Sequence, residues 1–376
     1  MDLFIKNALV FIDSEFIKKD ICIKNGVIVS FDKPSENMPE FDAGGNYLVP
    51  GFIDIHTHGA VGVDVNSASI EGFERMSRFF ASRGVTSFLA SILTDSEENT
   101  LKILSRISEY ISETHSGASL LGAHLEGPFL SPEKKGAMPE KYLRKGDSAL
   151  LKKYLDTGAV KYITVAPEVE GVKEIIEEFG AVLTFALGHS AADYQTTLNV
   201  IKSGAVASTH TFNAMQGIDR TEPNILGAVL EADIYNELIS DGYHVHPANM
   251  RMLYKLKGNK KIIAITDSIE AAGMPDGEYK LGVNSVSVKN GEAFLSGTKT
   301  RAGSVLTMDN ALKNLIKYLD ISLEKALPML TENPADMLSL KKGYIKIGYD
   351  ADFTVLDKDL NVINTIINGK MSNAGS

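Results

Sequence analysis

The strongest constraint on the fold of this chain is an alternation of short apolar runs with segments of helical period. Between the apolar runs, apolar residues recur at every third or fourth position, and these segments often end at glycine. Repeated about eight times over roughly 290 residues, this order predicts an α/β protein with a (β/α)8 TIM-like barrel rather than an open doubly wound sheet. The predicted strands are "PGFIDIHTH", "VTSFLASI", "LLGAHLEG", "YITVAPE", "AVLTFALGH", "VASTHTF", "NELISDG" and "KIIAITDS".

The two ends of the chain follow a different pattern. Residues 3–31 alternate apolar and polar side chains around a turn at Asn25 and Gly26, and the tail "GYIKIGYDADFTVLDKDLNVINTIINGKM" has short β-rich runs separated by Gly and Asp. Such runs are typical of short antiparallel strands. We therefore expect a small β-sandwich domain formed by both termini, residues 1–50 and 343–376, beside a barrel domain of residues 51–342.

Composition narrows the class of protein. The 376 residues are 44% hydrophobic, enough for a large core, and 48 acidic against 38 basic residues give a net charge of −10. Without a cluster of Lys or Arg, a nucleic-acid partner is not expected. The single cysteine, Cys22, excludes a disulfide within the chain. No apolar run approaches the ~18 residues of a membrane span, and the first residues lack a basic signal region, so we expect a cytoplasmic protein without a membrane partner.

The histidines are placed unevenly. One of the eight, His115, falls in a helix-to-strand connection, and the others lie in or just after predicted strands: His56, His58, His124, His189, His210, His244 and His246. A barrel gathers the C-terminal ends of its strands around one cavity. The histidines are therefore expected to converge there.

Two of them form a His-x-His pair. Residues two apart on a strand share a face, so His56 and His58 can bind one cation, although the pair alone could equally be structural. Three other predicted strands and the last one end in further candidate ligands, namely Glu126, His189, His210 and Asp267. Imidazole and carboxylate suit Zn²⁺ or another first-row divalent metal such as Fe²⁺ in a catalytic site. Asp267 is either a ligand, a proton acceptor from metal-bound water, or both.

Several motifs resemble a known family over nearly the whole chain. They are "PGFIDIHTHG", "HLEGPF", "GHS", "THTFNAM", "DGYHV", "TDS", "AGSVLTM" and "GYIKIGYDADFTVLD". Together they resemble the amidohydrolase superfamily and, within it, the N-acetylglucosamine-6-phosphate deacetylases. The resemblance implies deacetylation of N-acetyl-D-glucosamine 6-phosphate to D-glucosamine 6-phosphate and acetate in amino-sugar catabolism. It also implies a homodimer in which the neighbouring subunit helps to close the sugar-phosphate site.

The resemblance also implies roles for individual residues. Glu126, His189 and His210 match the metal ligands of the family, and Asp267 matches its catalytic acid/base. His56 and His58 match positions that some members keep and others have lost, so one or two metal ions per subunit are expected. The positions that match substrate contacts are Ala137, Asn213, Ala214, His244, Arg301, Ala302 and Gly303.

Two positions depart from the family pattern. Members often have Arg directly before Glu-Pro to hold the phosphate, but here Thr221 precedes residues 222–223 and Arg220 stands one place earlier. Met138 occupies a position where many members have His or Gln. Arg220 or Arg301 is therefore expected to contact the phosphate.

The expected mechanism is attack of a metal-activated water on the acetamido carbonyl, with Asp267 accepting the proton and returning it to the amine, and with His244 near the oxyanion. Three alternatives are an N-acetylgalactosamine-6-phosphate deacetylase, an amidohydrolase acting on a cyclic amide, and a non-catalytic sugar-phosphate sensor. Enzymes of the second kind often use a carboxylated lysine at a strand end, whereas Lys161 precedes its predicted strand. A sensor would not need the base Asp267.

Overall fold

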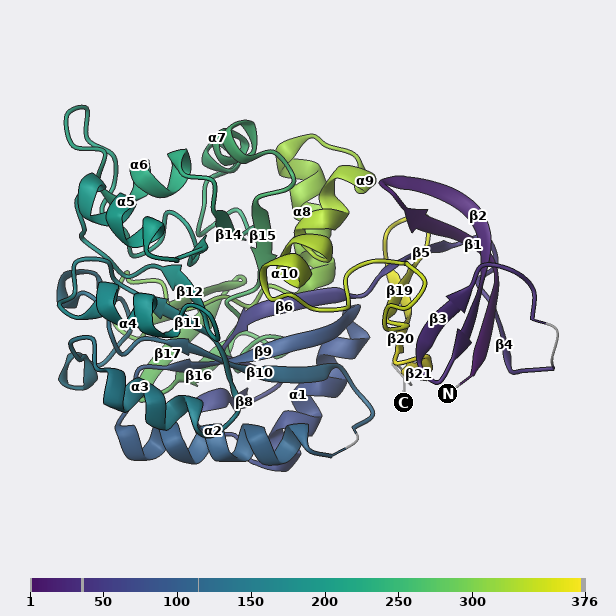
Figure 1. The fold of residues 1–376 in the computed structure, drawn as a ribbon, viewed down its shortest axis with the longest axis horizontal. Coiled ribbons are helices and arrows are strands. Elements are labelled where there is room, and N and C mark those ends of the chain that lie inside the picture. The colour runs from purple at the N-terminus through teal and green to yellow at the C-terminus, as the bar shows by residue number, and fades with distance from the viewer. Residues whose placement is uncertain (1, 35–36, 114, 373–376) are drawn as a thin grey trace.

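The computed structural model describes residues 2–34, 37–113 and 115–372, and within them the largest unit is a barrel of eight parallel strands (Figure 1). Each strand pairs with the next along the chain, and the barrel closes where Thr57 and Ser268 form a parallel bridge. All eight predicted strands are present, so the predicted (β/α)8 fold is confirmed. They are β6 (Phe52–Thr57), β9 (Val85–Leu93), β10 (Ser119–Glu126), β11 (Val160–Val165), β12 (Thr184–Leu187), β13 (Ala207–Ser208), β14 (Tyr235–Ile239) and β15 (Ile262–Ile265).

The barrel strands are buried on both faces and largely apolar because both faces are covered. Every residue of β6 and of β9 is buried. One face packs inside the barrel and the other packs against the surrounding helices, so continuous apolar runs replace strict alternation. This is why the sequence marks these strands by short uninterrupted runs.

The helices lie around the barrel (Figure 1). Side-chain caps begin several of them: Ser69 accepts a hydrogen bond from the Gly72 N–H, and Asp193 accepts one from the Thr196 N–H. None of the described helices is long and apolar enough to cross a bilayer. The helices are α1 (Ile70–Ser82), α2 (Glu97–Ile111), α3 (Ser148–Leu155), α4 (Val172–Phe179), α5 (Tyr194–Lys202), α6 (Asn224–Glu231), α7 (Pro247–Lys257), α8 (Met308–Leu319), α9 (Leu323–Ala326) and α10 (Glu332–Met337).

The strands from the two chain ends form a separate sheet beside the barrel (Figure 1). Antiparallel pairing of β5 with β19 joins the two ends, and the hydrogen bonds run through one continuous sheet around its own apolar cluster. The expected β domain from both termini is therefore present, while its limits at residues 50 and 343 stay a prediction. Its strands are β1 (Leu3–Ile12), β2 (Glu15–Lys24), β3 (Val27–Ser30), β4 (Glu40–Asp42), β5 (Tyr47–Pro50), β19 (Phe353–Leu356), β20 (Val362–Ile367) and β21 (Lys370–Ser372).

A three-stranded antiparallel sheet between β15 and α8 was not predicted from the sequence. It consists of β16 (Gly277–Leu281), β17 (Asn284–Lys289) and β18 (Glu292–Leu295). Alternating side chains and the turn at residues 290–291 were signals for a hairpin. A shorter pair, β7 (Gly59–Ala60) and β8 (Val63–Asp64), follows the first barrel strand.

Candidate metal centre

The six predicted metal ligands meet at the C-terminal end of the barrel. Four come from three strands and the segments that follow them: His56 and His58 at the end of β6, Glu126 as the last residue of β10, and His189 after β12. All six are buried, with exposed fractions of 8% or less. The remaining two, His210 and Asp267, follow β13 and β15.

Glu126 lies at the middle of this cluster. Its Oε1 is 3.0 Å from Nε2 of His189 and 3.0 Å from Nε2 of His210, and its Oε2 is 3.1 Å from Nε2 of His58. Within the described residues, two groups have donor atoms close enough to hold a cation, and they share Glu126: His56 with His58, and His189 with His210. Such a shared carboxylate allows either one ion or two adjacent ions to bind at this site.

Asp267 faces the first of these two groups. Its Oδ1 is 3.2 Å from Nε2 of His58 and 3.6 Å from Nε2 of His56. Its backbone N–H donates to the His56 carbonyl at 2.9 Å, and the Ser304 N–H donates to the Asp267 carbonyl at 2.7 Å. These bonds across the barrel seam fix the carboxylate beside both histidines.

Three candidate residues have left-handed backbone conformations. The φ angles of His189, His210 and Asp267 are 48°, 27° and 49°. Such angles are costly for residues with a Cβ and are retained where the surrounding structure holds them, which occurs often at functional sites. The strain therefore supports a role of these residues beyond packing.

Hydrogen bonds at the far ring nitrogen orient two of the histidines. Nδ1 of His58 is 3.1 Å from the Ser91 carbonyl, and Nδ1 of His189 is 2.8 Å from the Lys134 carbonyl. Since a carbonyl only accepts, each Nδ1 carries a hydrogen, which leaves Nε2, the nitrogen nearest Glu126, as the ring atom that would bind a metal ion in place of its proton. These are the tautomers that a metal ion requires.

The charge balance of the cluster also fits a cation. Burial alone would lower the pKa of His56 and His58, but neighbouring carboxylates raise the two values to about 9 and about 10. Burial likewise raises the pKa of Glu126, yet hydrogen bonds from His189 and His210 hold it well below its usual range. The carboxylates thus favour positive charge at the ring nitrogens, which a divalent ion supplies in place of protons.

A cavity of about 360 Å³ opens onto the cluster. It is lined by His58, Glu126, His189, His210 and Asp267, and by seven of the eight predicted substrate-binding residues, namely Ala137, Asn213, Ala214, His244, Arg301, Ala302 and Gly303. The eighth, Arg220, is exposed and is not among the lining residues. The structure therefore favours Arg301 over Arg220 as a residue of the cavity.

Arg301 and His244 have acidic partners at the cavity wall. The Arg301 guanidinium lies 2.6 Å from Glu292 and over the rings of Phe294 and Tyr243. Nδ1 of His244 is 2.6 Å from Asp241. These contacts hold both side chains in place before a ligand arrives.

Sequence reasoning missed several residues of the site. Lys134 lines the cavity, and its signal was the lysine pair at residues 134–135, in the connection that follows the strand ending in Glu126. Leu281 lines it from the unpredicted sheet. Met138, which the sequence had already singled out, also lines the cavity, is 2% exposed and packs in the same apolar cluster. Behind the cluster lies Glu237, whose signal was a lone charge inside an apolar strand. Lys161 is exposed on β11, away from the cluster.

Comparison with known proteins agrees with this geometry. Residues 47–372 match the model of the amidohydrolase family. The chain is 36% identical to the N-acetylglucosamine-6-phosphate deacetylase of Bacillus subtilis, with 98% of this chain and 97% of that protein covered. The crystal structure of the Pasteurella multocida deacetylase of the same name superposes with a TM-score of 0.93 at 31% identity, covering 99% of both chains. A Mycobacterium smegmatis deacetylase mutant, solved with N-acetyl-D-glucosamine-6-phosphate, gives a TM-score of 0.91 at 31% identity and also covers 99% of both chains.

The chain therefore belongs to the amidohydrolase family, a class of metal-dependent hydrolases. The barrel, the buried cluster of candidate ligands and the cavity are features that an enzyme of this class requires. Within the class, the chain is a member of the N-acetylglucosamine-6-phosphate deacetylases.

Proposed function

We propose that this chain hydrolyses the acetamide of N-acetyl-D-glucosamine 6-phosphate to D-glucosamine 6-phosphate and acetate, in amino-sugar catabolism. The observation that carries the proposal is that Asp267 and the cluster around Glu126 form one wall of a cavity whose other walls present polar and cationic groups. The relatives that share this name cover nearly the whole chain, and one of them binds this sugar phosphate.

The donor atoms around Glu126 support an assignment of the metal ligands. Glu126, His189 and His210 would hold one divalent ion, Zn²⁺ or Fe²⁺, and His56 and His58 would hold a second with Glu126 and Asp267. A bound ion of this kind lowers the pKa of a water and polarises a carbonyl oxygen.

Asp267 supplies the acid/base group. Burial would raise its pKa, but the hydrogen bond with His58 and the charges of His56 and His58 lower it, so the carboxylate is ionised and ready to accept a proton. It takes the proton of the attacking water and returns it to the departing sugar amine. His244, with Nδ1 held by Asp241, leaves its Nε2 for the substrate.

The phosphate group requires positive charge. Among the described residues that line the cavity, the Lys and Arg side chains are Lys134 and Arg301. Arg301 rather than Arg220 therefore takes the phosphate contact in this proposal, although Glu292 neutralises part of its charge. We also propose that the protein is a cytoplasmic homodimer whose neighbouring subunit completes the phosphate end, and light scattering tests the dimer.

The decisive experiment is an acetate assay. Protein loaded with Zn²⁺ or Fe²⁺ is incubated with N-acetylglucosamine 6-phosphate, with the galactosamine epimer, and with the first substrate in the presence of chelator. We expect acetate from the glucosamine substrate and its loss with chelator. A metal-loaded protein that releases no acetate from it would refute the proposal.

A further inference from the structure

Glu237 is a fully buried carboxylate behind the metal centre. It lies within β14 with an exposed fraction of 0%. Its Oε1 accepts a hydrogen bond from the Tyr162 hydroxyl at 2.8 Å. Its Oε2 accepts the backbone N–H of His210 at 2.9 Å and lies 3.0 Å from Nδ1 of His56. A buried charge is costly unless it is used in such a network.

One oxygen of Glu237 thus contacts a residue from each of the two candidate cation groups. His56 belongs to the group with His58, and His210 belongs to the group with His189. Both groups already share Glu126 on the cavity side. Glu237 joins them again from behind, through Oε2.

The contact with His56 determines which ring nitrogen is available. A carboxylate accepts, so Nδ1 of His56 carries the hydrogen, which leaves Nε2, 3.3 Å from Nε2 of His58, as the nitrogen that would bind a cation. The equivalent partners of His58 and His189 are backbone carbonyls. A carboxylate gives a stronger, charge-assisted bond and makes the imidazole a better ligand.

The contact with His210 supports its strained backbone. The φ angle of His210 is 27°, and within the described residues its Nδ1 is buried without a hydrogen-bond partner. The ring of His210 is therefore held by its Nε2 contact with Glu126 and by its backbone, whose N–H donates to the Glu237 carboxylate.

We propose that Glu237 is a positioning residue that prepares His56 and His210 for cation binding, and that the ion at His56, His58 and Glu126 depends on it most. The inference deepens the proposed function, because it rests on the metal centre used there. The reason for the asymmetry is that Glu237 contacts the ring of His56 but only the backbone of His210.

The test compares Zn²⁺ content in three variants with the wild-type protein. Glu237→Gln keeps the size and an amide oxygen that can accept both bonds at Oε2, but it removes the charge. Tyr162→Phe is the matched control, because it removes the contact at Oε1 and leaves Oε2 untouched. The double variant His56→Ala, His58→Ala is the reference for complete loss of the cation group formed by His56 and His58. Each protein is saturated with Zn²⁺, dialysed against graded chelator, and analysed for Zn²⁺ per subunit and for thermal unfolding.

We expect two Zn²⁺ per wild-type subunit and one in the double variant. Glu237→Gln should release one ion at about 10- to 100-fold lower chelator strength, the range measured for partners of metal-ligating histidines, while the other ion stays. Tyr162→Phe should follow the wild type. Co²⁺ loading of the same proteins should show a changed visible spectrum in Glu237→Gln and not in Tyr162→Phe.

Three results would overturn the inference: wild-type protein that takes up a single Zn²⁺, Glu237→Gln with a wild-type chelator profile, or Tyr162→Phe with the same loss as Glu237→Gln. An unchanged melting temperature in Glu237→Gln beside lost Zn²⁺ separates positioning from a general role in folding. Because the readout is Zn²⁺ content, a protein that binds two ions as expected and releases no acetate would count against the proposed function alone.

Discussion

At the scale of the residue, the position of the Asp267 carboxylate determines what it can do chemically. The residue is 8% exposed, so its side chain reaches the cavity while remaining largely out of solvent. Its Oδ1 lies within 3.6 Å of both His56 and His58, whose positive charge keeps it ionised. A carboxylate beside a metal-activated water is suited to move a proton from that water to the amine.

Replacing Asp267 with Asn keeps the size and removes the base. We expect Asp267→Asn to lower kcat by at least ~10²-fold, the lower range for acid/base catalysis, with metal still bound at Glu126, His189 and His210. Steady-state kinetics and elemental analysis on the same preparation measure both. Asp276→Asn, an exposed acid outside the cavity, is the control. Turnover near the wild-type value in Asp267→Asn would contradict the assigned role.

At the scale of the element, the inserted sheet β16–β18 shapes the cavity. Leu281 lines the cavity, and Asn284 at the start of β17 donates from Nδ2 to the Ala137 carbonyl at 2.8 Å. The segment held in this way also contains Lys134, whose carbonyl accepts from His189. The sheet therefore supports both the cavity wall and the candidate ligand His189.

Asn284→Ala removes the hydrogen bond from the Asn284 side chain to the Ala137 carbonyl. A typical buried hydrogen bond contributes about 1 kcal/mol, so we expect KM for the sugar phosphate to rise by about fivefold while kcat changes little. Steady-state kinetics measure the two constants separately. Ser285→Ala, on the exposed side of the same strand, should leave both unchanged. A fall in kcat without a change in KM would contradict the assignment.

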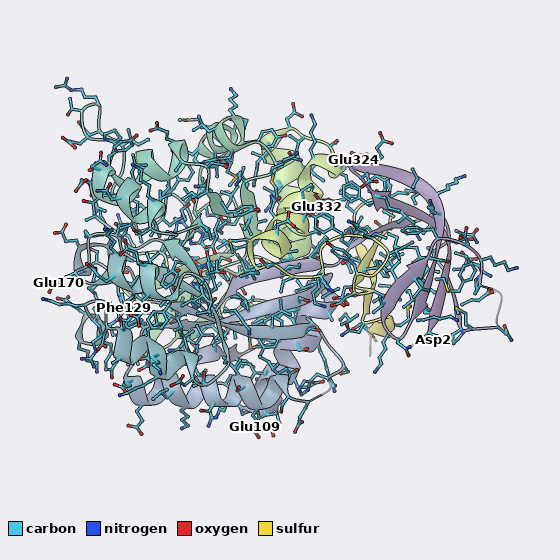
Figure 2. All side chains as sticks on the ribbon, in the orientation of Figure 1. Asp2, Glu109, Phe129, Glu170, Glu324 and Glu332 are labelled. Atoms are coloured by element: carbon cyan, nitrogen blue, oxygen red, sulfur yellow. The ribbon has the colours of Figure 1, made fainter. Side chains whose placement is uncertain are left out.

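Helix α10 contains an acid with an unusual pKa. Glu332, labelled in Figure 2, lies in its first turn, and burial together with the charge of Asp336 raises its pKa from 4.5 to about 7. The folded chain therefore binds a proton that the unfolded chain releases between these two values. By linkage, the free energy of unfolding falls as pH rises from about 5 to about 7.

Glu332→Gln should remove this pH dependence. Above pH 7 we expect the variant to be more stable than the wild type by about 1 kcal/mol, a value reduced for the partial exposure of the side chain. Urea unfolding at pH 5.5 and pH 8 measures the difference. Glu324→Gln in α9, a carboxylate also labelled in Figure 2, is the control. If the free energy of unfolding depends on pH equally in Glu332→Gln and in the wild type, Glu332 is not the cause of that dependence.

At the scale of the whole molecule, a buried ion pair lies within the C-terminal segment, beside the point where the chain enters the barrel. Lys342, 9% exposed, lies 2.5 Å from Asp352 and 2.9 Å from Asp350. The Asp352 carbonyl accepts from the Gly51 N–H, at the point where the chain enters the first barrel strand. The ion pair thus lies where the sheet domain and the barrel are connected.

Lys342→Met leaves the buried carboxylate of Asp352 without its partner. Breaking such a pair from one side costs about 3–5 kcal/mol, so we expect a large loss in the free energy of unfolding. Chemical denaturation measures it. The exposed neighbour Lys341 provides the control Lys341→Met, which should be near wild type. A loss below 1 kcal/mol in Lys342→Met would show that water replaces the pair.

The sequence by itself determined the eight barrel strands and the residues that end them, because burial on both faces leaves short apolar runs and a polar side chain at each strand end is conspicuous. It also indicated the β domain from both termini. Only the tertiary structure decided that Glu237 contacts His56 and His210, and that Arg301 rather than Arg220 lines the cavity. The physical reason is that strand formation depends on local pattern, whereas these contacts depend on the stagger of eight strands and on the path of the loops between them.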